Sequence, residues 1–325
     1  MRIGVIGTGY WGRNIVRNLQ RQRDVDSLVV CDQNPQALGA IAAAFPTVET
    51  IPETSKFLAD PDLAGVFVVT PPETHYEMGC RVLDAGKHLY IEKPFVTRTE
   101  HAQDLVERAA TGSLQLMSGH TFLYSPPVRE VKRIIERGDL GQVEFISFRR
   151  INLGIHQRAV NVVWDLLPHD LSMVLYWLGD VQLRQARSFL KTSVGVHPDV
   201  GSVFMEFDNG TMMEGLVSWL SPRKLRETIV VGNRRMLIYN DTEPEEKIKI
   251  YDKKVEELEP GDFGEFQLAY RVGDVISPRI DSSEPLGLMV ADFIDAIRNN
   301  RPPLSDGEFG LRITGMIEQA LRDAD

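Results

Sequence analysis

The segment that most constrains the fold is a glycine-rich turn near the start of the chain, Gly7-Thr8-Gly9-Tyr10-Trp11-Gly12. An apolar run from Arg2 to Ile6 precedes it, and a helix-like stretch from Asn14 to Leu19 follows it. Strand, glycine turn and helix in this order form the setting in which GxGxxG acts as a dinucleotide-binding turn. The first glycine permits the tight turn, the second lets the backbone approach a pyrophosphate, and the third lets the helix pack closely on the strand. We therefore expect the N-terminus of this helix to face phosphates.

A carboxylate follows the next strand at the position that such a turn requires. The apolar run from Ser27 to Cys31 ends at Asp32, near the offset of about 20 residues at which a carboxylate binds the ribose. No arginine adjoins Asp32, and a carboxylate accepts from a ribose 2′-hydroxyl but repels a 2′-phosphate. The sequence therefore favours NAD over NADP. The alternative is that the glycines only form a turn and that Asp32 caps a helix.

Strands and helices alternate through the first third of the chain. We expect strands at 64–70, 88–91 and 115–118, and helices at 73–85 and 98–110. This alternation predicts a doubly wound parallel sheet, whose ligands bind at the carboxyl ends of its strands. Two segments fall at such ends, Thr70-Pro71-Pro72 and Glu92-Lys93-Pro94. We expect both to line one crevice.

The second half of the chain has a different pattern. Six runs predict strands, at 182–191, 202–207, 211–220, 226–231, 236–239 and 247–251. Asp208-Asn209-Gly210 is a strong hairpin signal between two of them. Helices are expected at 286–299 and 309–322, and a long loop at 261–284. The predicted fold is thus α/β, with a Rossmann domain over 1–121 and a second α/β domain with an open, mostly antiparallel sheet over 122–325.

Composition limits the class of partner. The 325 residues include 36 basic and 46 acidic side chains, which gives a net charge of −10, so we expect neither a nucleic-acid nor a membrane partner. The two cysteines, Cys31 and Cys80, lack the spacing of a disulfide framework or a zinc site. Because the chain begins directly with a strand pattern and has no long apolar run, we expect a cytoplasmic protein.

Five segments together resemble the Gfo/Idh/MocA oxidoreductase family. They are the glycine turn that starts at Gly7, Val69 to His75, Gly86 to Pro94 with its GKHLYIEKP sequence, Gly119 to Phe122, and Trp164 to Asp170. The resemblance spans roughly the whole chain and implies NAD-dependent oxidation or reduction of a sugar. It also implies a second domain with the substrate site on one face of its sheet and an oligomer contact, in a homodimer or homotetramer, on the other.

The resemblance assigns the catalytic lysine to Lys93, the aspartate to Asp165 and the histidine to His169. The residues suit that chemistry, because oxidising an alcohol needs a hydride acceptor and a group that takes the hydroxyl proton. Lys93 can donate a hydrogen bond to the alcohol oxygen. A neutral His169 can accept the proton, since the usual pKa of histidine lies near 6.5. In this family the Lys-Pro peptide bond is commonly cis.

Asp165 and His169 lie four positions apart and share one face if the segment is helical. Pro168 is best tolerated in a first helical turn, so the helix could begin near Asp165, and Asp165 could then be only an N-cap. His169 could equally be a packed core histidine. No third ligand accompanies the pair, so we expect no metal site.

The expected cofactor-binding residues are Gly7, Thr8, Gly9, Tyr10, Trp11, Gly12, Asp32, Thr70, Pro71, Pro72, His75, Glu92 and Lys93. The expected substrate-binding residues are His120, Tyr124, Arg149, Arg158 and Trp164. His120, Tyr124 and Trp164 could form a wall for a sugar ring or belong to the core. One of Arg149, Arg150 and Arg158 could bind a pyrophosphate, or all could be surface residues. If this segment is a strand, alternation sends Arg149 and Arg150 to opposite faces.

Within the family, the segments starting at Gly119 and Trp164 look most like nucleotide-sugar 3-dehydrogenases and ketoreductases. We therefore expect hydride transfer at a ring hydroxyl or keto carbon, at C3 of a UDP-N-acetylhexosamine or its uronic acid. One alternative is a free-sugar or inositol dehydrogenase. A second is an NAD-binding regulator without catalysis, because fold does not imply function.

Overall fold

The computed structural model describes residues 1–154, 156–157, 159–257 and 268–322, and contacts within the chain divide it into two compact units. The first unit contains Met1–Tyr124 and Ser283–Glu318, and the second contains Ser125–Ser282 and the residues from Gln319 on. The expected second domain ran from residue 122 to the end. The chain instead returns to the first unit at Ser283.

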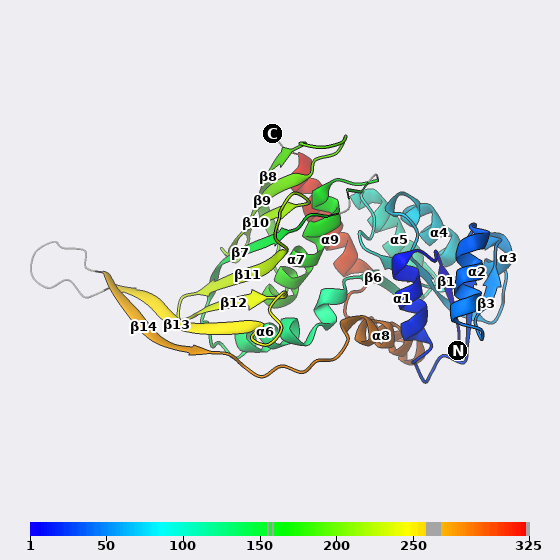
Figure 1. The fold of residues 1–325 in the computed structure, drawn as a ribbon, viewed down its shortest axis with the longest axis horizontal. Helices are drawn as coiled ribbons and strands as arrows, with labels where there is room; N and C mark the ends of the chain where they lie inside the picture. Colours follow the sequence, from blue (N-terminus) through cyan, green and yellow to red (C-terminus); the bar gives the residue numbers. More distant parts are fainter. Residues whose placement is uncertain (155, 158, 258–267, 323–325) are drawn as a thin grey trace, which may run out of the picture. The chain divides into compact units, whose positions relative to one another are not determined.

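A parallel sheet forms the centre of the first unit (Figure 1). In the described part of the chain it has six strands in the order β3-β2-β1-β4-β5-β6, which is the order of doubly wound dinucleotide-binding folds. The predicted Rossmann sheet is confirmed. Its strands are β1 (Arg2–Ile6), β2 (Ser27–Cys31), β3 (Glu49–Ile51), β4 (Leu63–Val68), β5 (His88–Glu92) and β6 (Leu116–Gly119).

Helices connect these strands and bury them. The helical segments are α1 (Tyr10–Leu19), α2 (Pro35–Ala44), α3 (Thr54–Leu58), η1 (Pro72–Thr74), α4 (His75–Asp84), α5 (Thr99–Thr111) and η2 (Thr121–Tyr124). One hydrophobic cluster joins Val68 and Ile91 of the sheet to Val82 of α4 and Leu105 of α5. Burial of apolar area of this kind contributes about 25 cal/mol per Å² to folding. It makes the sheet a rigid base for the residues at its strand ends.

The returning segment adds α8 (Pro285–Asn299) and the start of α9 (Gly307–Arg322) to the first unit. Phe293 packs edge-to-face on Phe67, with ring centroids 5.1 Å apart. The Ser118 N–H donates to the Ser305 carbonyl at 2.8 Å, and the Ser305 hydroxyl donates to the Ser118 carbonyl at 2.7 Å. These contacts are long-range in sequence, so a reading of local patterns could not assign the segment to this unit.

The second unit is built on a sheet that has eight strands within the described ranges, in the order β14-β13-β12-β11-β7-β10-β9-β8. Only β7 and β10 pair in parallel there, which confirms the predicted mostly antiparallel sheet. Its elements are α6 (Pro126–Glu136), β7 (Val143–Ile151), α7 (Val162–Leu178), β8 (Leu183–Lys191), β9 (Val200–Phe207), β10 (Met212–Ser218), β11 (Leu225–Gly232), β12 (Met236–Asn240), β13 (Ile248–Glu257) and β14 (Leu268–Ile276).

Two local predictions in this unit have opposite outcomes. The hairpin at 208–210 is confirmed, because Gly210 has a φ of +83° and β9 pairs antiparallel with β10. The loop expected at 261–284 is wrong for Leu268–Ile276, which forms β14 against β13. Pairing with β13, the preceding strand in the chain, overrode the Gly, Pro and Asp content of this stretch. Residues 258–267 lie outside the described residues.

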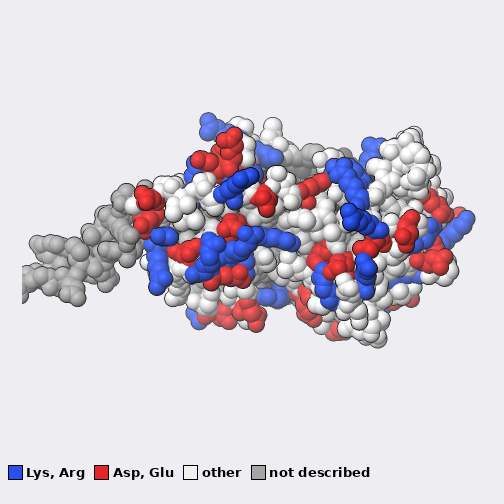
Figure 2. Space-filling view, turned by 90° about the horizontal axis from the view of Figure 1, so that it is seen from below, with Lys and Arg blue, Asp and Glu red and all other residues white. Residues whose placement is uncertain are grey.

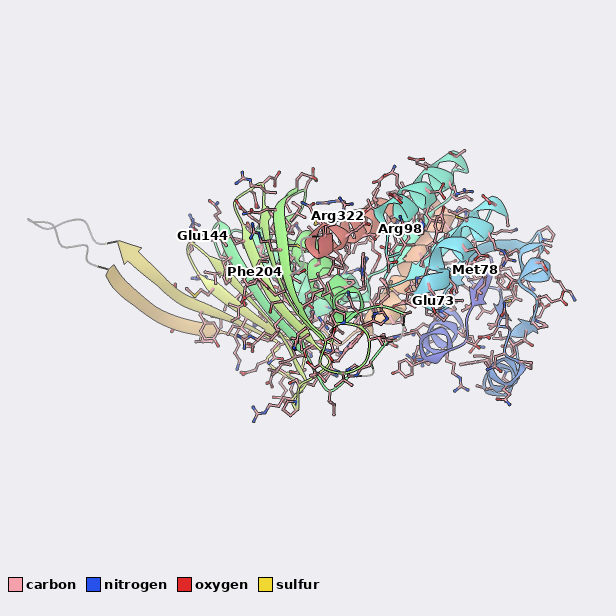
Figure 3. The ribbon with its side chains drawn as sticks, turned by 90° about the horizontal axis from the view of Figure 1, so that it is seen from above. Glu73, Met78, Arg98, Glu144, Phe204 and Arg322 are labelled. Atoms are coloured by element: carbon pink, nitrogen blue, oxygen red, sulfur yellow. The ribbon has the colours of Figure 1, made fainter. Side chains whose placement is uncertain are left out.

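The two faces of the second sheet differ. On one face Val203, Met205 and Phe207 of β9 are buried, and α7 packs against this strand. The opposite face exposes large apolar side chains, with Phe189, Phe204 and Met212 at 53%, 43% and 55% exposure. Figure 3 labels Phe204 on this sheet.

Candidate active site

The glycine turn has the geometry that the motif predicts. Gly7 has a φ of +97°, in the left-handed region that favours glycine, and its N–H donates to the Cys31 carbonyl at 2.9 Å. A Cβ on Gly12 would lie 2.1 Å from the Gly7 carbonyl oxygen, so a side chain there would force the turn apart. A Cβ on Gly9 would meet nothing within 4 Å. The backbone thus requires glycine at two positions, and the third faces open space.

Helix α1 begins directly after this turn. Gly9 is its N-cap, and no side chain caps the first N–H groups. A cavity of about 480 Å³ adjoins this helix end, and its lining residues are Thr8, Gly9, Tyr10, Arg13, Asn14, Ala37 and Ala40. Open N–H groups and the helix dipole stabilise an anion at such a position. The open side of Gly9 and this cavity fit the pyrophosphate of a dinucleotide.

Asp32 is held in place at the end of β2. Its carboxylate accepts hydrogen bonds from the Thr8 hydroxyl at 2.6 Å, the Thr8 N–H at 2.8 Å and the Asn34 N–H at 2.9 Å. Partial burial would raise the pKa of Asp32, but these hydrogen bonds outweigh it and hold the pKa below its usual value. Asn34, rather than Asp32, caps α2 through Gln36 and Ala37. Asp32 is therefore an ionised, fixed acceptor next to the glycine turn, which fits a ribose.

The residues after β4 form the next part of this edge. Thr70 and Pro72 are half-buried and Pro71 is exposed. His75 is fully buried, and its two ring nitrogens each lie 2.8 Å from a carbonyl oxygen, one of Thr70 and one of Pro94. Its contacts join the ends of β4 and β5. His75 therefore positions the residues around it, and its ring nitrogens are not available to a cofactor.

Lys93 follows β5 and precedes Pro94 in a cis peptide bond, as the resemblance implies. The side chain of Glu92 is buried and accepts a hydrogen bond from the Tyr90 hydroxyl at 2.6 Å. Burial raises the pKa of Glu92, while Tyr90 and Lys93 oppose the rise. A Cβ on Gly119 would lie 2.5 Å from the Tyr90 oxygen, so the neighbouring strand also needs a glycine here. Glu92 supports this site from the interior.

Helix α7 carries the other two catalytic candidates. Asn161 is its N-cap and accepts from the N–H groups of Val163 and Trp164. The alternative in which Asp165 is the N-cap is therefore wrong, and Pro168 lies inside the helix instead of in its first turn. Asp165 accepts a hydrogen bond from the Trp219 indole N–H at 3.0 Å. Asp165 and His169 are both half-buried one helical turn apart, which places them on one face.

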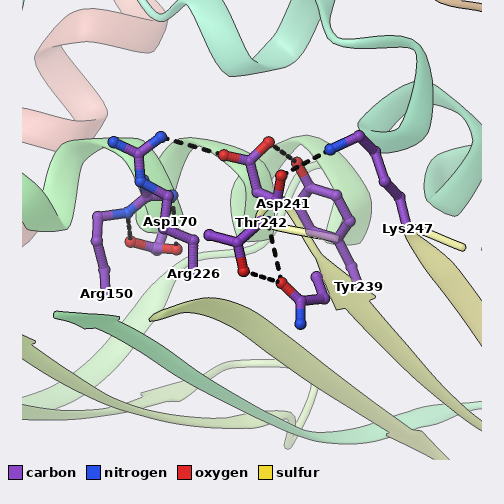
Figure 4. Close-up of polar contacts among 8 residues, drawn as sticks. Arg150, Asp170, Arg226, Tyr239, Asp241, Thr242 and Lys247 are labelled. Carbon is purple, nitrogen blue, oxygen red and sulfur yellow. Dashed lines mark hydrogen bonds and ion pairs between the residues drawn. The ribbon is translucent and has the colours of Figure 1, made fainter. Parts of the chain in front are cut away.

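A buried ion pair next to His169 connects α7 to the second sheet (Figure 4). Arg150 of β7 donates to Asp170 through Nε at 2.5 Å and Nη2 at 3.1 Å, and both side chains are 3% exposed. Nearby, Arg226 donates to Asp241 at 3.1 Å, and the Tyr239 hydroxyl donates to the same carboxylate at 3.2 Å. Paired, bidentate geometry is the condition under which buried charges are tolerated. The residue after His169 is thus fixed to a strand.

The expected substrate residues have different surroundings. Tyr124 is fully buried and its hydroxyl donates to Asp292 at 2.7 Å, which favours the core alternative over the sugar-binding wall. Trp164 is 9% exposed. Arg149 is exposed on the face of β7 opposite the buried Arg150, as strand alternation requires. Arg158 lies outside the described residues.

Several site-building residues gave no signal in the sequence. Trp219 follows β10, and its partner Asp165 lies 54 positions earlier. His156 lies with its ring centroid 5.2 Å from that of Trp219 and its Nε2 3.8 Å from Asp199. The alternation of β7 did predict that Arg150 and Arg149 face opposite ways. It could not reveal that Asp170 is the partner of Arg150.

Charge on the surface is mixed. On the face shown in Figure 2, basic and acidic side chains lie side by side, in keeping with 36 basic and 46 acidic residues. Among the helices that the structure describes, none combines the length and the apolar character that crossing a membrane requires.

Comparisons with known proteins agree with this geometry. Residues 1–120 match the model of an oxidoreductase family with an NAD-binding Rossmann fold, and residues 128–238 match the GFO/IDH/MocA C-terminal domain. The chain is 27% identical over 333 residues to UDP-N-acetylglucosamine 3-dehydrogenase from Acidithiobacillus ferrooxidans, covering 96% of this chain and 94% of the relative. It is 24% identical over 227 residues to inositol 2-dehydrogenase from Rhizobium meliloti, covering 67% and 68%.

A solved structure shares the fold over nearly the whole chain. The WlbA dehydrogenase from Bordetella pertussis, in complex with NADH and UDP-GlcNAcA, superposes with a TM-score of 0.81 at 18% identity. The likeness covers 99% of this chain and 95% of that one.

Proposed function

The chain belongs to the GFO/IDH/MocA family of NAD-binding oxidoreductases, and from this premise we propose that it oxidises or reduces a nucleotide-linked sugar at C3. The substrate class is a UDP-N-acetylhexosamine or its uronic acid. The observation that carries the proposal is the similarity to a UDP-N-acetylglucosamine 3-dehydrogenase, which extends over nearly the full length of both chains.

The cofactor is held by the first unit in this proposal. The glycine turn and the N-terminus of α1 take the pyrophosphate, Asp32 takes the ribose, and the Thr70-Pro71-Pro72 segment and Lys93 line the nicotinamide half. Bound NAD supplies the hydride acceptor or donor. The supporting observations are the open side of Gly9, the uncapped start of α1 and the ionised Asp32.

Three side chains carry the chemistry in this proposal. Lys93 donates a hydrogen bond to the reacting oxygen and stabilises the charge that develops on it. His169 takes the proton of the alcohol and returns it in the reverse direction. Asp165, held by Trp219, orients His169 or a neighbouring sugar hydroxyl. Arg149, Arg158 and Trp164 stay candidates for substrate contacts.

We further propose that the chain forms a homo-oligomer through the outer face of the second sheet. The observation that supports this proposal is the exposure of three large apolar side chains, Phe189, Phe204 and Met212, on this face. We also propose a cytoplasmic location, where Cys31 and Cys80 stay as the thiols that the structure shows.

A substrate panel tests the function. Purified protein with NAD is mixed with UDP-linked N-acetyl sugars and their uronic acids, and separately with glucose and inositol, while nicotinamide absorbance is followed. Reduction of NAD by the UDP-sugars is the expected result. Reduction by inositol only would favour the second candidate, which the similarity to inositol 2-dehydrogenase supports. NAD binding without turnover of any sugar, together with a Lys93→Ala variant that keeps full biological activity, would favour a regulator.

A further inference from the structure

His120 follows the last residue of β6, just as Lys93 follows the last residue of β5. Glu92 and Gly119 are paired across the two parallel strands, and Lys93 and His120 are the residues that follow them. Both residues therefore leave the sheet at its carboxyl edge. In doubly wound folds this is the edge at which ligands bind.

The imidazole of His120 is buried without a hydrogen-bond partner. Its exposure is 1%, and among the described residues neither Nδ1 nor Nε2 has a partner. By contrast, His75 contacts two carbonyls and the Nδ1 of His88 accepts from the Gln115 N–H at 2.8 Å. Burial of an unpaired polar group costs folding free energy, so native structures rarely keep one except where a ligand, a water or catalysis needs it.

The charge state of His120 narrows what it can bind. Burial lowers its pKa to about 3, and the positive charge of Lys93 contributes to the lowering. The ring is therefore neutral in ordinary buffers, with one nitrogen that donates and one that accepts. The Phe309 ring packs against it, with centroids 5.7 Å apart, and restrains its orientation. A hydroxyl or a primary carboxamide, which both donate and accept, would satisfy it.

We propose that His120 is a ligand-binding residue whose imidazole hydrogen-bonds a hydroxyl or carboxamide group of the bound cofactor or sugar, next to Lys93. The proposal deepens the function proposed above and rests on it. From the sequence, His120 was expected to line a sugar ring or to belong to the core, and the proposal gives its imidazole a hydrogen-bonding role. In this proposal, the ligand supplies the hydrogen-bond partner that His120 lacks among the described residues.

Two substitutions separate this role from a structural one. His120→Phe keeps the bulk and removes both nitrogens, and His120→Gln restores a donor and an acceptor. His88→Phe is the matched control, because it removes a histidine that has a partner, at the opposite end of β5. Thermal unfolding without ligand, NAD affinity by calorimetry, and kcat/KM with a UDP-sugar are measured for each.

We expect His120→Phe to melt at or above the wild-type temperature while kcat/KM falls about tenfold or more, and His120→Gln to recover part of that loss. His88→Phe should melt lower and keep its kcat/KM. An NAD affinity that falls about tenfold in His120→Phe identifies the cofactor as the source of the bound group. An unchanged NAD affinity with a lower kcat/KM identifies the sugar.

A His120→Phe protein that melts below wild type, as His88→Phe does, would overturn the proposal, because the ring would then have a structural partner. Unchanged NAD affinity together with unchanged kcat/KM would overturn it as well. If the wild type oxidises none of the sugars, the proposed function fails, and the NAD affinity of His120→Phe then tests the role of His120 by itself. A lower NAD affinity in His120→Phe than in the wild type then supports the proposal, and an unchanged affinity overturns it.

Discussion

Asp170 follows His169 in α7, and its carboxylate accepts two hydrogen bonds from the buried guanidinium of Arg150. Successive residues of a helix are rotated by about 100° around its axis, so fixing Asp170 to β7 also fixes the direction of His169. Pro168 has no N–H to donate to the preceding turn, which leaves this part of α7 with fewer backbone constraints. The ion pair and the Trp219 contact to Asp165 hold the helix here.

Removing one partner of this pair should destabilise the protein strongly. Asp170→Asn leaves Arg150 buried without its counter-charge, and we expect the free energy of unfolding to fall by about 3–5 kcal/mol. The double variant Arg150→Met/Asp170→Leu removes both charges and should regain most of that stability. Denaturant unfolding of the three proteins gives the comparison. A double variant as unstable as Asp170→Asn would show that the uncompensated charge of Arg150 is not the cause of the lost stability.

Alanine substitutions of two glycines of the turn and one glycine of α2 should have three different outcomes. Gly9→Ala should fold normally and lose NAD binding, because its methyl group would enter open space where we place the pyrophosphate. Gly12→Ala should fail to fold properly, because of the 2.1 Å approach to Gly7. Gly39→Ala, in an open position of α2, should keep NAD binding and gain about 0.5–1 kcal/mol of stability. Calorimetric NAD titration and thermal unfolding measure these effects. Wild-type NAD affinity in Gly9→Ala would move the pyrophosphate away from this turn.

Cofactor preference should depend on the Asp32 carboxylate. Asp32→Ala should lower NAD affinity about tenfold or more, because hydrogen bonds to a charged group are lost, while NADP affinity stays the same or rises. Asp62→Ala, an exposed carboxylate elsewhere in this unit, serves as the control. Titration with both cofactors measures the ratio. An NAD to NADP ratio that does not change would remove Asp32 from cofactor selection.

The interface proposed on the outer face of the second sheet can be tested by measuring the oligomeric state. Phe204→Glu places a charge in the proposed interface and should convert the oligomer to smaller species in analytical ultracentrifugation. Arg184→Glu, on the same sheet but in a polar setting next to Glu206, controls for added charge. A wild-type protein that sediments as a monomer would contradict the proposed interface.

The sequence predicted the parts of the fold that depend on local patterns. The glycine turn, the Asp32 strand and the hairpin at Asp208-Asn209-Gly210 each follow from residues within one short segment, and the structure bears them out. The return of the chain to the first unit at Ser283 depends on distant partners, and strand β14 depends on its pairing with β13. No periodicity within those segments specifies them.

The candidate site divides in the same way. The resemblance implied Lys93 before Pro94 in a cis peptide bond, and spacing predicted that Asp165 and His169 share a face. The sequence left Tyr124 open as a wall or a core residue, because its partner Asp292 is 168 positions away. The sequence could not predict the burial of Asp170 for the same reason, because its partner Arg150 lies on a different element, 20 positions earlier. The contact of Trp219 with Asp165 likewise depends on how β10 and α7 pack together in the fold.

Tracing the hydride tests the central claim most directly. UDP-N-acetylglucosamine with deuterium at C3 is incubated with NAD and either the wild-type protein or Lys93→Met, and the NADH formed is examined by mass spectrometry. We predict deuterated NADH from the wild type, and NAD binding with turnover about a hundredfold lower in Lys93→Met. Unlabelled NADH, or a Lys93→Met protein as fast as the wild type, would contradict this account of the site.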